Sequence, residues 1–275
     1  MMNNQNQNNT VALTISNLDS LGLPGDQKRI RILWMYPSSL NLHGGRGDIM
    51  ALLRFATMAG IPVEIQRVEQ LTDPVPLHMA DMLYFSSGDL TCMPHVIRAL
   101  EPAKEALKAF AAQNKVIVAN GSTGAVLAKQ LRLLDGTVVP GLGLLGMDWT
   151  QRRTVQGDDL WMDGINGIQV VGNEIKLAEI ALEPGQAPFG KVRYGHGNDG
   201  TGYEGAVTGN VIYTSCLGPV LVRNPALTME LLRRAALAAG LEIPQEQFVL
   251  GSDDVSFEEK ALEEAKKFIR NKMDK

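Results

Sequence analysis

Four apolar tracts that alternate with helical segments constrain the fold of this chain more than any other feature. The tracts have the length and composition of β-strands: RIRILWMY (29–36), VEIQRV (63–68), MLYFSSG (82–88) and KVIVAN (115–120). Helices are expected at about 44–60, 95–114 and 122–133. Strands that alternate with helices predict a parallel sheet with right-handed crossovers and helices on both faces, and with ligands at the carboxyl ends of the strands.

The second half of the chain has a different pattern. From 136 to 220, short segments rich in glycine and valine predict an antiparallel portion of the same sheet. MELLRRAALAAG (229–240) has helical spacing and ends at Gly240. SFEEKALEEAKKFIRNKM (256–273) predicts a charged helix, capped by Ser256, whose i,i+4 charge pairs form a solvated face. The expected fold class is therefore α/β: a three-layer, mostly parallel sheet with an antiparallel extension.

Three parts are expected along the chain. Residues 1–28 form an N-terminal extension, in which the first ten residues are too polar to order and 11–16 form a short strand. Residues 29–245 form one α/β domain, because no linker-like stretch interrupts them. Residues 246–275 carry the charged C-terminal helix.

Composition excludes several functional classes. The chain has 275 residues, of which 45% are apolar and 20% charged, and a net charge of −4, as expected of an ordinary globular protein. Lysine and arginine form no basic stripe, so nucleic acid is not an expected partner. The N-terminus lacks the pattern of a signal peptide, and no apolar run approaches the ~18 residues of a spanning helix. A cytoplasmic protein without a membrane span is expected.

No metal or cofactor is expected from the sequence. The two cysteines, Cys92 and Cys216, and the four histidines form neither a disulfide framework nor a cluster with metal-ligand spacing. The chain also lacks a dinucleotide-binding glycine fingerprint after a strand and a phosphate-binding GxxxxGK[ST] motif.

One ordered stretch carries a family resemblance. MYPSSLNLHGGRGDIMALLRFATMAGIPVEI (35–65) resembles the opening of the GatD family, the glutamine amidotransferase subunits of lipid II isoglutaminyl synthases, in the cobyric-acid-synthase-like branch of the class I amidotransferases. His43, Gly45 and Asp48 depart from the family pattern. The matching residues are Tyr36, Pro37, Leu40, Asn41, Leu42, Gly44, Arg46 and Gly47. The segments 133–146, 193–200 and 210–221 resemble later parts of the same domain, so the resemblance spans about 30 to 240.

The resemblance implies a fold, a reaction and a partner. It implies the flavodoxin-like fold of class I amidotransferases, in which a cysteine on a strand-to-helix turn attacks the glutamine amide, a histidine activates it and backbone N–H groups stabilise the oxyanion. It implies a Mur-ligase-like partner, similar to MurT, which uses ATP to activate the D-glutamate carboxylate of lipid II and receives the ammonia. Glutamine is the small-molecule ligand that it implies.

Three parts of the implied site have changed in this chain. The family's Cys-Gly-Gly turn is matched by Asn120, Gly121 and Ser122, with Asn120 in the left-handed backbone of the tight turn. The family's base histidine is matched by Leu217, which cannot accept a proton. The glycine-rich oxyanion loop is matched by Ser86, Ser87, Gly88 and Asp89. The joint change predicts a subunit without glutaminase activity, whose former ligand pocket is formed by Ser87, Gly88, Asp89, Asn120, Gly121 and Ser122.

Other interpretations remain open. A relocated nucleophile could be Cys92 with His95 at i,i+3, or Ser122 with His196; the alternatives are that Cys92 precedes a helix and that Ser122 and Thr123 cap one. Strand alternation turns Cys216 away from the face of Leu217. With a relocated nucleophile, the chain would be an active glutaminase or a related amidohydrolase. A cobyric-acid-synthase-like accessory or ligand-binding protein is a further alternative.

Overall fold

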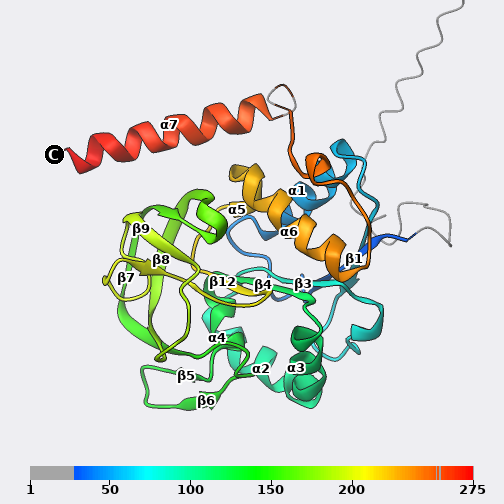
Figure 1. The fold of residues 1–275 in the computed structure, drawn as a ribbon. Helices are drawn as coiled ribbons and strands as arrows, with labels where there is room; N and C mark the ends of the chain where they lie inside the picture. Colours follow the sequence, from blue (N-terminus) through cyan, green and yellow to red (C-terminus); the bar gives the residue numbers. More distant parts are fainter. Residues whose placement is uncertain (1–27, 252, 254, 275) are drawn as a thin grey trace, which may run out of the picture.

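The computed structural model describes residues 28–251, 253 and 255–274 (Figure 1). The predicted strand at 11–16 and the polar first ten residues lie outside the described residues. The first sheet has the strand order β11-β12-β4-β3-β1-β2. Its strands are β1 (Ile30–Met35), β2 (Val63–Val68), β3 (Met82–Phe85), β4 (Val116–Asn120), β11 (Ala206–Thr208) and β12 (Val211–Thr214). All pairs are parallel except β11 with β12, which confirms the predicted parallel sheet.

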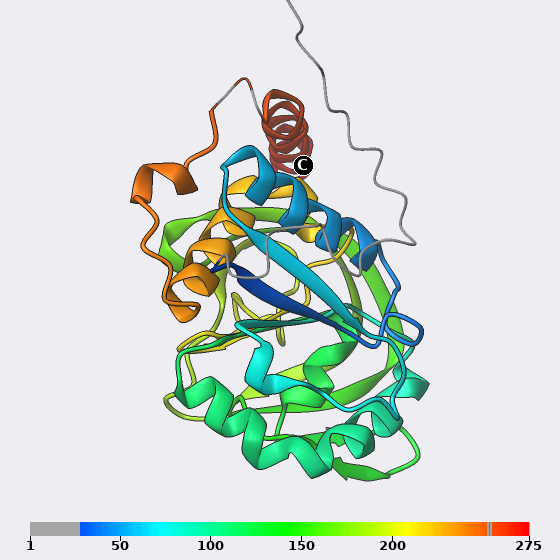
Figure 2. The same ribbon diagram turned by 90° about the vertical axis from the view of Figure 1, so that its right-hand side faces the viewer.

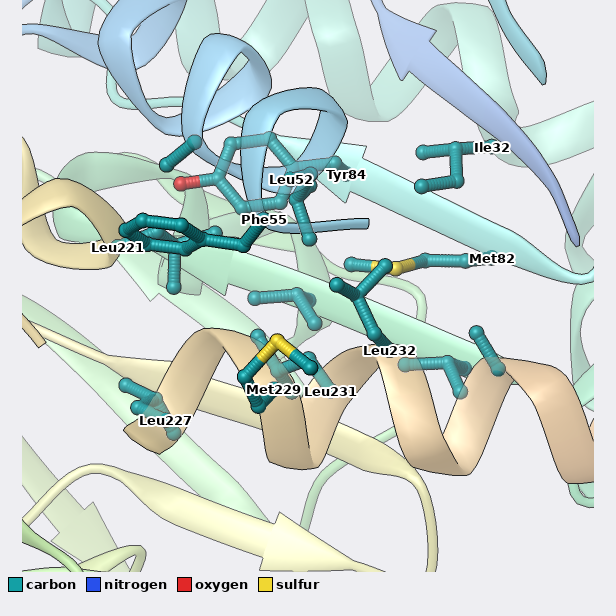
Figure 3. Packing of buried hydrophobic residues seen from close by; sticks show 14 of the residues in the cluster. Ile32, Leu52, Phe55, Met82, Tyr84, Leu221, Leu227, Met229, Leu231 and Leu232 are labelled. Atoms are coloured by element: carbon teal, nitrogen blue, oxygen red, sulfur yellow. The ribbon is translucent and has the colours of Figure 1, made fainter. Parts of the chain in front are cut away.

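Helices cover both faces of this sheet, because its central strands are apolar on both sides (Figure 1). On one face lie α1 (Gly45–Met58), α5 (Val220–Arg223) and α6 (Pro225–Ala238). On the other lie α2 (Met93–Leu100), α3 (Lys104–Ala112) and α4 (Gly124–Leu127). Figure 3 shows the core on the first face, where Phe55 of α1 and Leu232 of α6 meet the strands. The predicted three-layer α/β fold is confirmed.

A second sheet corrects the prediction for residues 136–220. Its order is β10-β9-β7-β5-β6, with β8 paired to β7. Its strands are β5 (Gln130–Arg132), β6 (Val138–Pro140), β7 (Met147–Asp163), β8 (Gln169–Leu182), β9 (Gly190–Tyr194) and β10 (Tyr203–Glu204). The prediction of one continuous sheet holds for β11 and β12 only, because β7 and β8 satisfy their backbone hydrogen bonds chiefly with each other.

The helix predicted over 122–133 was wrong in length. A 3-10 turn at Gly121–Thr123 leads into α4, which ends at Leu127. After it, Gln130–Arg132 pairs with β6 and β7 as a strand. Three-residue β5 has partners on both sides, so its backbone groups are satisfied without a helix.

The helix predicted over 95–114 is divided into two parts. A 3-10 turn at Glu101–Ala103, which contains Pro102, separates α2 from α3. Proline has no backbone N–H to donate, and it is therefore tolerated where one segment ends and the next begins.

The charged C-terminal helix, α7 (Ser256–Met273), has the predicted bounds. Ser256 does not cap it, because Val255 holds the cap position and no side chain caps the helix. One face of α7 is not solvated, since Ile269 packs with Trp161 and Val171 of the second sheet. The ion pairs within α7 have i,i+3 spacing and not the predicted i,i+4 spacing. Other charged side chains of α7 form ion pairs with the rest of the protein.

None of the helices in the described part of the chain is long and apolar enough to cross a membrane. Within the same residues, no group of three or more histidine, cysteine, aspartate or glutamate side chains could hold a metal ion.

The core between α6 and the sheet supplies a stability prediction. Leu232 is fully buried, whereas Leu237 of the same helix is 64% exposed. We expect Leu232→Ala to lower the free energy of unfolding by about 2–5 kcal/mol, because it leaves a cavity. Leu237→Ala should change it by less than about 0.5 kcal/mol. Urea unfolding of the three proteins measures both values, and equal losses would contradict the described packing.

Candidate functional site

The turn after β4 lies at the carboxyl end of the parallel sheet, where open α/β sheets place their ligands. Asn120 still pairs with Thr214 of β12 and keeps an extended backbone, with φ −126° and ψ 151°. Gly121 takes the left-handed backbone instead, with φ +61°. The prediction that Asn120 adopts this conformation was therefore wrong, because Asn120 is still paired as the last residue of β4 and the bend comes at the next residue, Gly121.

Gly121 is the point at which the parts of the predicted site meet. A Cβ atom on Gly121 would lie 2.6 Å from Ser87 Oγ and 2.8 Å from Leu217 Cδ2. The outer side of the bend therefore faces the predicted oxyanion loop and the predicted base position together. The side chain of Asn120 points elsewhere, toward Asp48 in α1. The structure thus brings together Ser87, Gly121 and Leu217, and leaves Asn120 outside this group.

The hydroxyl of Ser122 fastens the oxyanion loop to the turn. It donates to the carbonyl of Gly88 at 2.6 Å, accepts from the N–H of Gly88 at 3.0 Å and lies 3.2 Å from Ser87 Oγ. Thr123 Oγ1 donates to the carbonyl of Asn120 at 2.8 Å. The prediction that these two hydroxyls cap the following helix was wrong, since no side chain caps either helical segment.

Asp89 closes the loop on its far side. Its carboxylate accepts from Thr91 N at 2.8 Å and from Thr91 Oγ1 at 2.6 Å. It therefore caps the 3-10 turn at Leu90–Cys92. Its two bonds hold the loop that contains Ser87 and Gly88 in one conformation.

Strand β8 covers the turn. Leu217 donates its N–H to the carbonyl of Asn173 at 2.8 Å, and the N–H of Asn173 lies 3.3 Å from the carbonyl of Leu217. Beyond this bridge, β8 encloses a cavity of about 20 Å³. The cavity is lined by Gly121, Ser122, Trp149, Ile175, Lys176, Leu177, Ala178, Ile180, Tyr213 and Ser215. A volume of this size holds about one water molecule.

The structure does not assemble the two alternative catalytic pairs. The ring Nε2 of His196 lies 3.4 Å from Arg152 Nη1 and 3.5 Å from Glu179 Oε2, whereas the hydrogen bonds of Ser122 go to Ser87 and Gly88. Cys92 is half-buried before α2 and His95 is exposed. Within the described residues, no hydrogen bond joins these two side chains.

Cys216 faces away from the turn, as strand alternation predicts. It is fully buried and packs against Gly172 of β8. Burial raises the pKa of the Cys216 thiol well above its ordinary value. A thiol in such surroundings stays protonated and is a poor nucleophile.

A buried carboxyl group lies beneath the turn, and sequence reasoning noted it only as a departure from the family pattern. Asp48 is fully buried, accepts from Leu221 N at 2.7 Å and from Tyr84 Oη at 2.7 Å, and lies 3.5 Å from Asn120 Nδ2. Burial raises the pKa of Asp48 to about 7, and these hydrogen bonds oppose the rise without offsetting it. An aspartate beside the apolar positions on the inner face of α1 is the sequence signal that could have revealed it.

A second buried acid was also missed. Glu204 is fully buried and accepts from Thr214 Oγ1 at 2.9 Å and Ser215 Oγ at 2.8 Å. Burial raises the pKa of Glu204 to about 7. Lys176 of β8 donates to the carbonyls of Gly197 and Asn198, and burial lowers its pKa. Glu204 thus links β10 to the end of β12, and Lys176 links β8 to the loop after β9.

The residues of the family motif seat the start of α1 against the segment that carries Leu217. A Cβ on Gly44 would lie 2.9 Å from Pro219 Cδ, and one on Gly47 would lie 3.0 Å from Pro219 Cγ, so only glycine permits this approach. Tyr36 is buried at the end of β1 with φ +54°, and burial raises its pKa to about 12. Two further motif residues lie nearer the surface: Asn41 is exposed and Arg46 is half-buried.

Residues 31–224 match the sequence model of a CobB/CobQ-like glutamine amidotransferase domain. The match covers well over half of the chain, and the chain therefore belongs to this family of class I glutamine amidotransferases. The GatD subunit of lipid II isoglutaminyl synthase (glutamine-hydrolyzing) from Staphylococcus aureus strain N315 is 25% identical over 203 residues, which cover 74% of this chain and 82% of that subunit.

Two solved structures are similar to the chain at lower sequence identity. The structure of PurLQS from Thermotoga maritima has a chain with 14% identity and a TM-score of 0.49, covering 77% of this chain and 97% of that one. The crystal structure of a glutamine amidotransferase has 15% identity and a TM-score of 0.47, with coverages of 76% and 99%.

The two buried acids supply a pH prediction. A carboxyl group whose pKa is higher in the folded state than in the unfolded chain stabilises the fold fully below its unfolded pKa, and this contribution is lost as pH rises to the folded pKa. For Asp48 this window runs from about 4 to about 7. In the wild type, Asp48 should make the free energy of unfolding fall by about 1.4 kcal/mol for each pH unit across this window. We expect Asp48→Asn to remove this contribution to the slope.

Urea unfolding at several pH values measures this slope. Asp135→Asn is the control, because hydrogen bonds from Thr137 hold the pKa of the exposed Asp135 below its ordinary value and outside the window. The same slope in wild type and in Asp48→Asn would contradict the assignment of Asp48 as a buried, proton-binding group.

Proposed function

We propose that this chain is a GatD-like subunit that lacks glutaminase activity and acts as the partner or regulatory subunit of a Mur-ligase-like enzyme in lipid II amidation, in the cytoplasm. The observation that carries the proposal is the geometry at Gly121. In a nucleophile elbow, the residue on the strained strand-to-helix turn presents the attacking atom. In this chain the residue with the left-handed backbone is Gly121, and not Asn120, which the sequence comparison matched to the family's cysteine. Gly121 has no side chain, and Leu217 Cδ2 would lie 2.8 Å from the Cβ of any replacement.

Hydrolysis of an amide by a thiol needs a nucleophile, a base and oxyanion donors. At Gly121 there is no thiol, and Leu217, which is 3% exposed, cannot take up a proton. The neighbouring hydroxyl of Ser122 already donates to the carbonyl of Gly88. The groups nearest to the turn therefore supply neither the nucleophile nor the base.

The space beside the turn supports the same proposal. The cavity at Gly121 and Ser122 measures about 20 Å³, whereas pockets for small ligands usually measure about 300–1,000 Å³. The small volume of this cavity supports a role for the chain that does not depend on glutamine binding. We therefore include no glutamine-binding step in the proposed function.

A partner is proposed because the chain has the fold of the family although the proposed site lacks a nucleophile and a base. The relative from Staphylococcus aureus is by its name a subunit of lipid II isoglutaminyl synthase. In this chain the close packing of Gly44 and Gly47 on Pro219 is retained although the neighbouring Leu217 cannot act as a base. Retention of the fold without the reaction favours a binding role, in which the subunit stabilises or regulates a ligase that uses free ammonia.

The first test is a glutaminase assay. The purified chain, incubated with L-glutamine alone and together with the Mur-ligase-like protein of its source organism, should release no ammonia above the buffer blank. Release of ammonia in either mixture would overturn the non-catalytic part of the proposal. Cys92→Ala and Ser122→Ala would then show whether either residue is the nucleophile, because its loss would abolish turnover.

The second test is complex formation. We expect the chain and that Mur-ligase-like protein, when expressed together, to elute as one complex in size-exclusion chromatography, with a mass equal to the sum of the subunits by light scattering. Separate elution at micromolar concentrations of both proteins would contradict the proposed partnership.

A further inference from the structure

We propose that α7 is a latch, which holds β8 closed over the turn at Gly121 and whose release breaks the bridge between Asn173 and Leu217. The bridge and β8 enclose the cavity of about 20 Å³ beside Gly121, so release of the latch opens that cavity. The latch goes beyond the proposed function and does not depend on it, because it is a movement within this chain. Two features of the structure support it: the weak attachment of α7, and a series of contacts that leads from α7 to the bridge.

Few residues of α7 are buried. Two of its 18 residues, Lys266 and Ile269, are buried, whereas nine of the 14 residues of α6 are. Ile269 packs with Trp161 and Val171 in a cluster that is separate from the two larger cores. The buried ammonium of Lys266 pairs with Glu263 at 2.9 Å, and desolvation of its charge opposes the gain from this pair. Elements with few buried apolar contacts open at low free energy, so α7 can leave while the two larger cores stay folded.

The middle of α7 is not closely packed. A crevice of about 220 Å³ lies between the protein body and α7, and its lining residues are Val171, Arg223, Ala261, Leu262 and Ala265. Atoms beside such a gap lose dispersion contacts, which lowers the free energy that holds α7 in place. Figures 1 and 2 both show α7 on the outer surface of the molecule. Loose packing and an outer position are the conditions under which a helix can detach from a folded domain.

Ion pairs hold the two ends of α7. Glu258, near its start, pairs with Arg54 of α1. Near its end, Lys272 pairs with Asp158 at 3.0 Å and with Asp159 at 2.6 Å. The side chains of Lys272 and Asp158 are 35% and 32% exposed, and ion pairs at such exposure each contribute little and weaken with salt. The ion pairs therefore set the position of α7 without making its attachment permanent.

The contact at Lys272 continues to the bridge. Asp159, which accepts from Lys272, also accepts from Asn173 Nδ2 at 3.1 Å. Asn173 lies opposite Asp159 in the ladder of β7 and β8, and its backbone forms the bridge to the segment after β12. The other anchor, Ile269, packs with Val171, which lies two residues before Asn173 in β8. Both anchors of α7 therefore reach β8 beside the bridge, and release of α7 removes the support of this part of β8.

The test compares matched variants of the full chain. Ile269→Ala combined with Lys272→Ala removes both anchors of α7. Phe257→Ala combined with Lys267→Ala is the control on the same helix, because Phe257 is 82% exposed and Lys267 has its ion pair within α7, with Glu264 at 3.8 Å. Hydrogen–deuterium exchange of each protein is read by mass spectrometry with fragmentation, which resolves single amides.

We expect the amides of α7, and the bridge amides of Asn173 and Leu217, to exchange at least ~10-fold faster in the anchor variant than in wild type, because the open state becomes more populated. The control variant should stay within about 2-fold of wild type. Strand β1 is the reference for global unfolding, and it should exchange at the wild-type rate in all three proteins.

Three outcomes would overturn the latch. Faster exchange in α7 without faster exchange at the bridge would show that α7 does not hold β8. Unchanged exchange in both would show that Ile269 and Lys272 do not anchor α7. Equal acceleration in β1 would show global unfolding in place of a local opening. None of these outcomes bears on the proposed function, which the ammonia assay and complex formation test.

Discussion

The backbone bridge between Asn173 and Leu217 is the contact on which the arrangement of the site depends. It joins β8 of the second sheet to the segment that follows β12 of the first, through hydrogen bonds of 2.8 and 3.3 Å. Because the bridge is made by backbone groups, it fixes the position of β8 whatever side chain stands at 217. With β8 fixed there, the cavity beside Gly121 has room for about one water.

The parallel sheet and the position of its turn could be predicted because both depend on local patterns. The second sheet could not be predicted as separate, since β7 pairs with β8, β5 and β9 through contacts that periodicity does not specify. The structure places Leu217 and Ser87 beside Gly121, while their role in a ligand site stays a prediction. The backbone conformation of Asn120 was not predicted correctly, because it depends on where the pairing of β4 with Thr214 ends. Asp48 and Glu204 were missed, since burial of a charge is decided by tertiary packing.

The proposed loss of the reaction is compatible with an intact scaffold for a physical reason. Amide hydrolysis would need a nucleophile at position 121 and a base at position 217. Gly121 has no side chain, and the apolar side chain of Leu217 packs closely against it. The contacts that support this region, between Gly47 and Pro219 and between Asp48 and Leu221, do not involve a side chain at either position. The fold at this turn therefore does not depend on catalytic side chains at Gly121 and Leu217.

The central claim is that no reactive nucleophile faces a glutamine site in this chain. A chloroketone analogue of glutamine alkylates the nucleophile of a glutaminase, and mass spectrometry of the intact protein detects the adduct. The account predicts that the native chain, with excess analogue at pH 7, forms no adduct that glutamine prevents, because Cys216 is buried and Gly121 has no side chain. Alkylation of the half-buried Cys92, if it occurs, should be insensitive to glutamine. A stoichiometric adduct that excess glutamine prevents would contradict the account, and peptide mapping would identify the nucleophile.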